Sequence, residues 1–206
     1  MNEWERIGEN QLDLLREIGN IGAGHAATAM SKLLNKPVNM EVPQVRLVPF
    51  DQIAEQVGGP EAVVAAIFLR IEGQVSGNMF LLMSVQAAKE LVKSIFPLEP
   101  SSSGDLYFSD IEISALSEVG NILAGSYLSS LSDFMQASLS PTVPGFAVDM
   151  AGAILAYGLI PFDETDALLI ETSFLDGMER IESHMFLLPD PDSFARIFTL
   201  LGVPAQ

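Results

Sequence analysis

Two groups of polar residues recur 101 positions apart, and each combines a carboxylate with an amide at helical spacing. The positions are Asp13, Glu17 and Asn20 in the first copy, and Ser114, Glu118 and Asn121 in the second. Residues at i, i+4 and i+7 of a helix lie on one face. Core positions recur in any duplicated fold because packing demands them. A Glu and an Asn do not pack a core, so their recurrence indicates a shared chemical task.

The chemistry open to such a pair is narrow. An amide both donates and accepts hydrogen bonds, so it can orient a water molecule, and amide side chains do this in phosphoryl hydrolysis. A carboxylate can hold a lysine or a metal-bound water. His25 and His184 have no matching partners in the repeat, which leaves no catalytic triad. One carboxylate and one amide are also too few ligands for a metal cage. The pattern therefore favours a pair inserted into a partner's active site over the alternative of a merely solvated helix face.

A second match supports the duplication. Residues 79–82 (Met-Phe-Leu-Leu) return as 185–188, at an offset of 106. The five extra residues are expected in a hairpin loop, where added length costs little. We predict one compact domain, 1–206, made of a first repeat (1–96), a linker (97–104) and a second repeat (105–206). A proline follows each asparagine at the same distance, as Pro43 and Pro144.

Local signals predict an α+β fold, with two long helices packed on a shared, largely antiparallel sheet and related by a pseudo-twofold axis. The first helix is expected from Gln11 to Asn35, with Asn10 as its cap and a buried Leu14–Ile18–Ile21 stripe. Ser109 and Glu112 have capping-box spacing for the second. Internal glycines at 19, 22, 24, 120 and 125 are expected to let another backbone approach. Short helices are predicted at 86–96 and 192–201, and strands at 38–48, 62–72, 74–84, 151–159, 167–174 and 180–188.

The composition indicates which classes of partner the chain could bind. The chain has 206 residues, a net charge of -17 and no cysteine. The negative charge argues against nucleic acid and anionic membranes, and it favours a basic or metal-bearing partner. The absence of cysteine suits the cytosol. The N-terminus lacks the features of a signal peptide, and the longest apolar run is too short to span a bilayer. We expect a cytoplasmic protein that does not insert into membranes.

The doubled pattern Asp/Ser-x3-Glu-x2-Asn-x22-Pro resembles that of the CheC family of bacterial chemotaxis phosphatases, and the resemblance covers essentially the whole chain. It implies a hydrolase for the phospho-aspartate of the response regulator CheY. Asn20 and Asn121 would orient the attacking water, Glu17 and Glu118 would dock the regulator, and Asp13, Ser114, Pro43 and Pro144 would support the two motifs. Neither copy departs from the pattern, so both would be active.

The resemblance also implies partners. Phosphorylated CheY would bring its own Mg²⁺, so no cofactor or bound metal is expected in this protein. CheD, a receptor glutamine deamidase, is a second implied partner, and residues 146–154 are a candidate contact, with ordinary core as the alternative. CheX-type relatives carry one motif and dimerise, whereas the two motifs here suggest a monomer. FliY-type relatives carry a switch domain, and the end of this chain at Gln206 favours a free-standing form.

Two other function classes remain open at this point. Residues 22–27 match the dinucleotide pattern G-x-G-x-x-A, but they lie inside a predicted helix rather than after a strand, and the second repeat loses the pattern. The other alternative is a non-catalytic module of the chemotaxis or flagellar-switch apparatus that binds CheD or the phosphorylated regulator, as FliM resembles CheC without the motifs. Retention of both Glu–Asn pairs favours catalysis.

Overall fold

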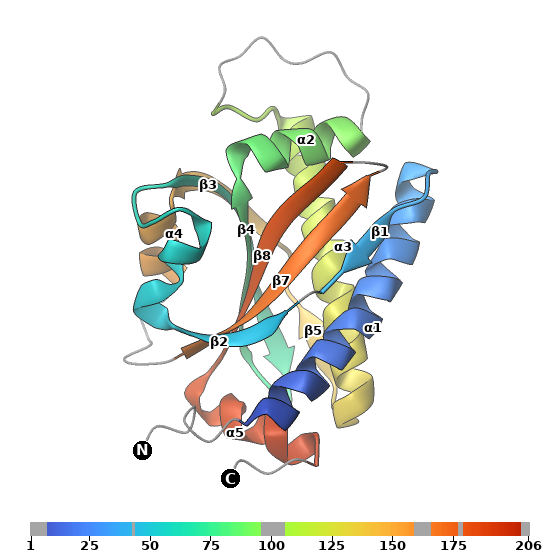
Figure 1. Ribbon diagram of the computed structural model, residues 1–206, viewed down its shortest axis with the longest axis vertical. Coiled ribbons are helices and arrows are strands. Elements are labelled where there is room, and N and C mark those ends of the chain that lie inside the picture. Colours follow the sequence, from blue (N-terminus) through green and yellow to red (C-terminus); the bar gives the residue numbers. More distant parts are fainter. Residues whose placement is uncertain (1–7, 43, 96–105, 159–165, 177–178, 203–206) are drawn as a thin grey trace.

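The computed structural model describes residues 8–42, 44–95, 106–158, 166–176 and 179–202 (Figure 1). The predicted linker, 97–104, and Pro43 lie outside the described residues. The described helices are α1 (Glu9–Leu34), α2 (Val85–Ile95), α3 (Asp110–Met135), α4 (Ala151–Gly158) and α5 (Pro191–Leu200), with two short 3-10 helices, η2 (Phe50–Gln52) and η3 (Ala54–Val57). The described strands are β1 (Asn39–Glu41), β2 (Val45–Pro49), β3 (Val63–Gly73), β4 (Gly77–Ser84), β5 (Leu139–Pro141), β6 (Gly145–Met150), β7 (Asp166–Asp176) and β8 (Glu179–Pro189).

The strands form one eight-stranded sheet in the order β1-β7-β8-β4-β3-β5, with β2 also paired to β7 and β6 to β3. Every described pairing is antiparallel. At the centre, Phe80 of β4 lies opposite Phe186 of β8, and these two residues are equivalent in the repeat. The sheet is therefore symmetric about this pair, and the predicted α+β fold with pseudo-twofold symmetry is confirmed.

Two hydrophobic cores lie on the two faces of the sheet. The larger core is formed under α1 and α3, together with α2 and α5. The smaller core includes Ile53, Phe80, Ile154 and Leu155 and is covered by η3 and α4. Figure 1 shows α1 and α3 side by side, with α2 and α5 at opposite ends of the molecule. The two long helices thus pack on the same face of the sheet, and their contacts with the larger core hold them in place.

The start of α3 follows the sequence prediction closely. The Ser109 N–H donates to Glu112 Oε2 at 2.7 Å, and the Glu112 N–H donates to Ser109 Oγ at 3.4 Å. Burial alone would raise the pKa of Glu112, but the bonds from Ser109 and Lys89 outweigh it and lower that pKa. The start of α1 differs from the prediction: the helix begins at Glu9, and the Gly8 N–H donates to Gln11 Oε1 at 2.8 Å. Gln11, at the third helical position, therefore satisfies the backbone N–H of the cap residue Gly8, whereas Asn10 lies inside the helix and is not its cap.

Only part of the predicted glycine contacts is found. An added Cβ on Gly22 would lie 3.0 Å from the Cα of Tyr127 in α3, so this glycine does allow close helix packing. Gly19 faces the side chains of Val42 and Tyr127, and Gly120 faces Ile67. An added Cβ on Gly24 would meet nothing within 4 Å, and neither would one on Gly125, so packing within the described chain does not explain those two.

Two predicted strands are wrong. Residues 151–158 form α4 instead of a strand, with Ala151, Ile154 and Leu155 buried at helical spacing over the smaller core. A short apolar run has no periodicity that separates these two structures. Residues 38–48 do not form one strand, because β1 pairs with 173–175 of β7 and β2 with 166–170. The described pairing of β1 ends at Glu41 opposite Ser173, and that of β2 begins at Val45 opposite Ile170.

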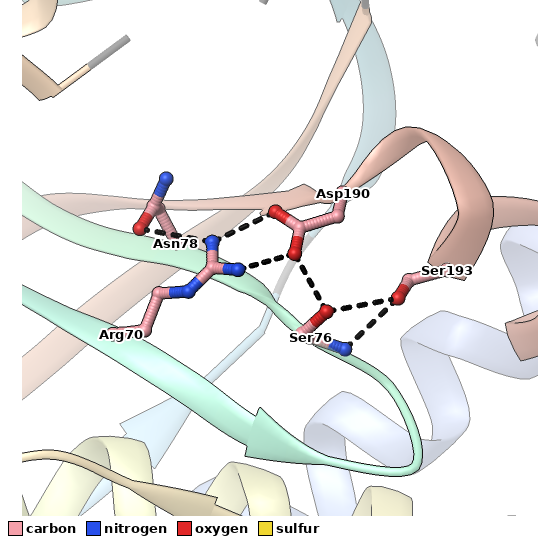
Figure 2. A network of polar contacts seen from close by, with 5 residues as sticks. All are labelled: Arg70, Ser76, Asn78, Asp190 and Ser193. Atoms are coloured by element: carbon pink, nitrogen blue, oxygen red, sulfur yellow. Dashed lines mark hydrogen bonds and ion pairs between the residues drawn. The ribbon is translucent and has the colours of Figure 1, made fainter. Parts of the chain in front are cut away.

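A polar cluster lies at the ends of β3, β4 and β8, where α5 begins (Figure 2). Arg70 binds both carboxylate oxygens of Asp190, at 2.7 Å for Nη1 to Oδ1. Ser76 Oγ donates to Asp190 at 2.6 Å, and the Ser76 N–H donates to Ser193 Oγ at 2.9 Å. The bonds from Arg70 lower the pKa of Asp190. This cluster ties the β3–β4 hairpin to the end of β8 and to α5, so its function is structural.

Candidate functional site

Helix α1 carries the first motif on its exposed side. Asp13, Glu17 and Asn20 are exposed, whereas Leu15, Ile18 and Gly22 are buried against the core. The predicted buried stripe is therefore shifted, because Leu14 and Ile21 are only half-buried. Asp13 forms an ion pair with Arg16 at 3.0 Å between Oδ1 and Nη2.

Helix α3 repeats this arrangement. Ser114, Glu118 and Asn121 are exposed, and the opposite side of the helix buries Leu116, Val119 and Leu123. Among the described residues, neither Glu17 nor Glu118 forms a hydrogen bond or an ion pair. Their carboxylates are therefore available to another molecule. Each lies on a helix whose other face is fixed by the core.

Asn20 is held by the chain that follows α1. The backbone N–H of Val42 donates to Asn20 Oδ1 at 3.2 Å. Only the oxygen of the amide can accept from an N–H, so this bond also fixes which way the amide points. The Nδ2 group is consequently left free to donate outward. Val42 itself is 3% exposed and packs on Gly19. Pro43, the next residue, lies outside the described residues, and its predicted supporting function stays a prediction.

The second motif differs at the matching loop. Val143, the equivalent of Val42, is 90% exposed, and Pro144 is half-buried. The position over Gly120 is filled by Ile67 instead, whose Cγ2 would lie 2.4 Å from an added Cβ. The two motifs therefore have the same exposed residues but different support. This difference could not be predicted from the sequence, since Val occurs at this position in both copies.

The two motifs lie at opposite ends of the helix pair. α1 and α3 run antiparallel: Gly22 contacts Tyr127, and Leu33 near the end of α1 lies beside Ser114 near the start of α3. Figure 1 shows the first motif helix starting at one end of the pair and the second at the other. Two partner proteins could thus approach the two motifs without competing for the same surface.

An open groove of about 450 Å³ adjoins the second motif. Three helices line it, with residues Leu33, Ile95, Asp110, Ile111, Ser114, Ala115 and Glu118. Two of these are motif positions, and the others are mostly apolar. Sequence reasoning missed this groove because its residues come from three helices that are far apart in the chain.

Other ionisable groups lie away from the motifs. His184 is half-buried on the opposite face of the sheet, near Glu171 and Arg46, and burial lowers the pKa of its imidazole. Arg46 pairs with Glu171 at 3.4 Å. Within the described part of the chain, no three His, Cys, Asp or Glu side chains lie close enough together to hold a metal ion. Nor is any described helix long and apolar enough to cross a membrane.

Comparison with known proteins assigns the family. The model of the CheC-like family matches residues 11–46 and 111–148, which contain both motifs. The chain is 42% identical over 206 residues to the CheY-P phosphatase CheC of Bacillus subtilis (strain 168), covering 98% of this chain and 99% of that protein. The protein belongs to the CheC-like family. The resemblance read from the doubled motif is thereby confirmed.

Two solved structures share the fold. The crystal structure of FliY from Thermotoga maritima has a TM-score of 0.77 and 18% identity, over 95% of this chain and 98% of that one. A CheX–CheY–BeF3–Mg²⁺ complex from Borrelia burgdorferi has a TM-score of 0.53 and 18% identity, over 82% of this chain and 95% of that one. At these identities the likeness concerns the fold.

Proposed function

We propose that this protein hydrolyses the phospho-aspartate of the chemotaxis response regulator CheY. The observation that carries the proposal is a Glu–Asn pair, exposed on a rigid helix, in both copies of a duplicated fold. The membership in the CheC-like family and the name of the Bacillus subtilis relative, CheY-P phosphatase CheC, support it.

The two side chains have different tasks in this proposal. The amide of Asn20 or Asn121 enters the regulator's active site and holds the attacking water in line with the phosphoryl group, which is the positioning function that amides have in phosphoryl hydrolysis. For Asn20, the bond from Val42 directs Nδ2 outward, so water would accept from this group. Glu17 or Glu118 docks beside the regulator's lysine or its metal-bound water and contributes charge at close range.

The metal belongs to the partner in this scheme. The related CheX–CheY complex contains Mg²⁺ together with BeF3. We propose that phosphorylated CheY supplies Mg²⁺ and the residues that hold its phosphoryl group, while this protein supplies no cofactor. The chain contributes an amide and a carboxylate on a helix packed against the core, and the bond from Val42 holds the Asn20 amide before binding, which lowers its ordering cost in the complex.

The test is phosphate release from phosphorylated CheY with Mg²⁺ present. The protein should accelerate release, and the Asn20→Ala/Asn121→Ala double variant should lose all of that acceleration. Circular dichroism and thermal melting of the double variant control for its fold. If the double variant accelerates release as well as the wild type, the assigned function of the asparagines is refuted. If the wild type binds phosphorylated CheY without accelerating release, the protein is a binding module instead.

Stoichiometry gives a second test. Because the motifs lie at opposite ends of the helix pair, a titration with BeF3-activated CheY should approach two regulators per chain. Each Asn→Ala single variant should keep part of the acceleration. A stoichiometry of one, with either motif removable at no cost, would contradict two working sites.

We also propose a cytoplasmic monomer that binds CheD. The suggested contact, residues 146–154, contains Ala151 and Ile154, which are buried in the smaller core, whereas Asp149 and Met150 are exposed. A partner could therefore touch this segment through exposed residues such as Asp149 and Met150, but not through Ala151 or Ile154. Light scattering on the purified protein, alone and mixed with CheD, tests the oligomeric state and the complex together.

A further inference from the structure

An exposed apolar residue recurs at the end of each long helix. Leu33 of α1 is 49% exposed, and Phe134 of α3, its equivalent 101 positions later, is 45% exposed. Both precede the last residue of their helix. The half of each side chain that is exposed to water does not stabilise the fold. Its recurrence is therefore the same kind of signal as that of the Glu–Asn pairs.

The antiparallel packing places each of these residues beside the motif of the other repeat. Leu33 lines the groove that also contains Ser114 and Glu118 of α3. At the other end of the helix pair, Leu131 of α3, one turn before Phe134, lines a small cavity with Leu15 of α1. The end of α3 that carries Phe134 therefore packs beside the N-terminal half of α1, which carries the first motif.

We propose that each catalytic site is composite, with its Glu–Asn pair from one repeat and an apolar docking residue from the other. Leu33 serves the motif on α3, and Phe134 serves the motif on α1. The inference rests on the proposed function and adds residues that determine how the regulator docks.

The position and the charge of the groove indicate which molecule binds in it. The groove is continuous with Glu118, so the partner that places its phosphoryl group at Asn121 also covers the groove. Its apolar centre includes Ile111, which is 60% exposed, and its rim carries the carboxylates of Asp110 and Glu118. A fitting surface has an apolar side chain ringed by basic residues beside a metal-bound phosphoryl group. The occupant is therefore the phosphorylated regulator itself.

The experiment separates the two sites with single-motif variants. Asn20→Ala leaves only the α3 motif working, and Asn121→Ala leaves only the α1 motif. In the Asn20→Ala background, Leu33→Gln should raise the KM for phosphorylated regulator by about fivefold, with kcat nearly unchanged, because half of a leucine side chain no longer gains from burial. In the Asn121→Ala background, Leu33→Gln should not change the rate of phosphate release relative to the Asn121→Ala protein. Phe134→Gln should raise the KM in the Asn121→Ala background and leave phosphate release unchanged in the Asn20→Ala background.

Val63 provides a matched control, since it is 42% exposed and lies at the start of β3, outside the groove and both motifs. Val63→Gln should change KM in neither background. The proposal is overturned if Leu33→Gln acts equally in both backgrounds, acts only on the α1 site, or has no effect on the α3 site. A change in oligomeric state on Leu33→Gln, measured by light scattering, would assign the groove to a second copy and would also overturn it.

The proposed function can fail independently of this inference. If the Asn20→Ala/Asn121→Ala double variant retains activity, the motif assignment is wrong. If that double variant is inactive and the Leu33 and Phe134 variants behave like Val63→Gln, only the composite site is wrong. Affinity for BeF3-activated regulator, measured on the same variants, should weaken by the same factor as KM rises, and an unchanged affinity would refute docking by Leu33.

Discussion

Replacing Asn20 by alanine should lower stability, whereas the same change at Asn121 should not. Both residues are exposed in the middle of a long helix, so both substitutions gain about 0.5 kcal/mol in helix propensity. Only Asn20, however, accepts a hydrogen bond from the N–H of the buried Val42. Without this acceptor, the N–H is left unsatisfied in a partly buried place.

The size of the difference follows from that one bond. An unsatisfied buried N–H costs about 1–3 kcal/mol, and the 3.2 Å length and part-burial of this bond place it near the lower end. Because the propensity gains cancel, Asn20→Ala should be less stable than Asn121→Ala by about 1–2 kcal/mol. For a protein of this size, that corresponds to about 2–8 °C in Tm.

Asn20→Asp separates stability from catalysis. The carboxylate keeps an acceptor for the Val42 N–H, but it lacks the Nδ2 donor that faces outward. In an Asn121→Ala background, Asn20→Asp should therefore melt close to the Asn121→Ala protein and give no acceleration of phosphate release. Thermal melting and a phosphate-release assay on the same preparations measure both quantities.

Two outcomes would refute this reasoning. Equal Tm values for Asn20→Ala and Asn121→Ala would show that the Val42 bond does not contribute in solution. Full acceleration by Asn20→Asp in the Asn121→Ala background would show that the outward donor is not used, and that water positioning must come from another group.

Three further predictions concern packing, pH and docking. Gly22→Ala should destabilise the protein by about 1–3 kcal/mol, because the new Cβ would lie 3.0 Å from the Cα of Tyr127. Gly24→Ala should stabilise it by about 0.5–1 kcal/mol, because the new Cβ would meet nothing within 4 Å. Thermal melting of the two variants measures both changes. Burial lowers the pKa of His184 from its usual value of 6.5, so the unfolded chain binds a proton at a higher pH than the folded protein does. The free energy of unfolding should therefore fall as the pH drops below 6.5. Chemical denaturation at a series of pH values should show this slope, and His184→Gln should flatten it. Glu17→Gln together with Glu118→Gln should raise the KM for phosphorylated regulator and reduce its salt dependence, and an unchanged KM in a salt titration would contradict docking by these carboxylates.

Much of the helix pair and the sheet could be predicted because the relevant signals are local. The Ser109–Glu112 capping box starts α3 with contacts three residues apart, and the Met79 and Met185 segments form the central strands, where their repeat-equivalent phenylalanines pair. The exposed face of Glu17 and Asn20 also follows from helical spacing alone. In each case the residues that decide the structure are close neighbours along the chain, or are duplicated in it.

Tertiary structure decided the features that depend on residues far apart in the sequence. Residues 151–158 are a helix because they cover a core formed by other strands, which their short apolar run does not reveal. Val42 fixes the amide of Asn20 across 22 residues, although Val143 at the matching position is exposed. The groove that joins Leu33 to Glu118 exists only because α1 and α3 pack antiparallel. The sequence by itself determined which side chains could act and on which helix face, because these follow from spacing along one helix. The surroundings of those side chains were determined by packing between elements, because a contact between distant segments depends on the whole fold and leaves no periodic trace in either segment.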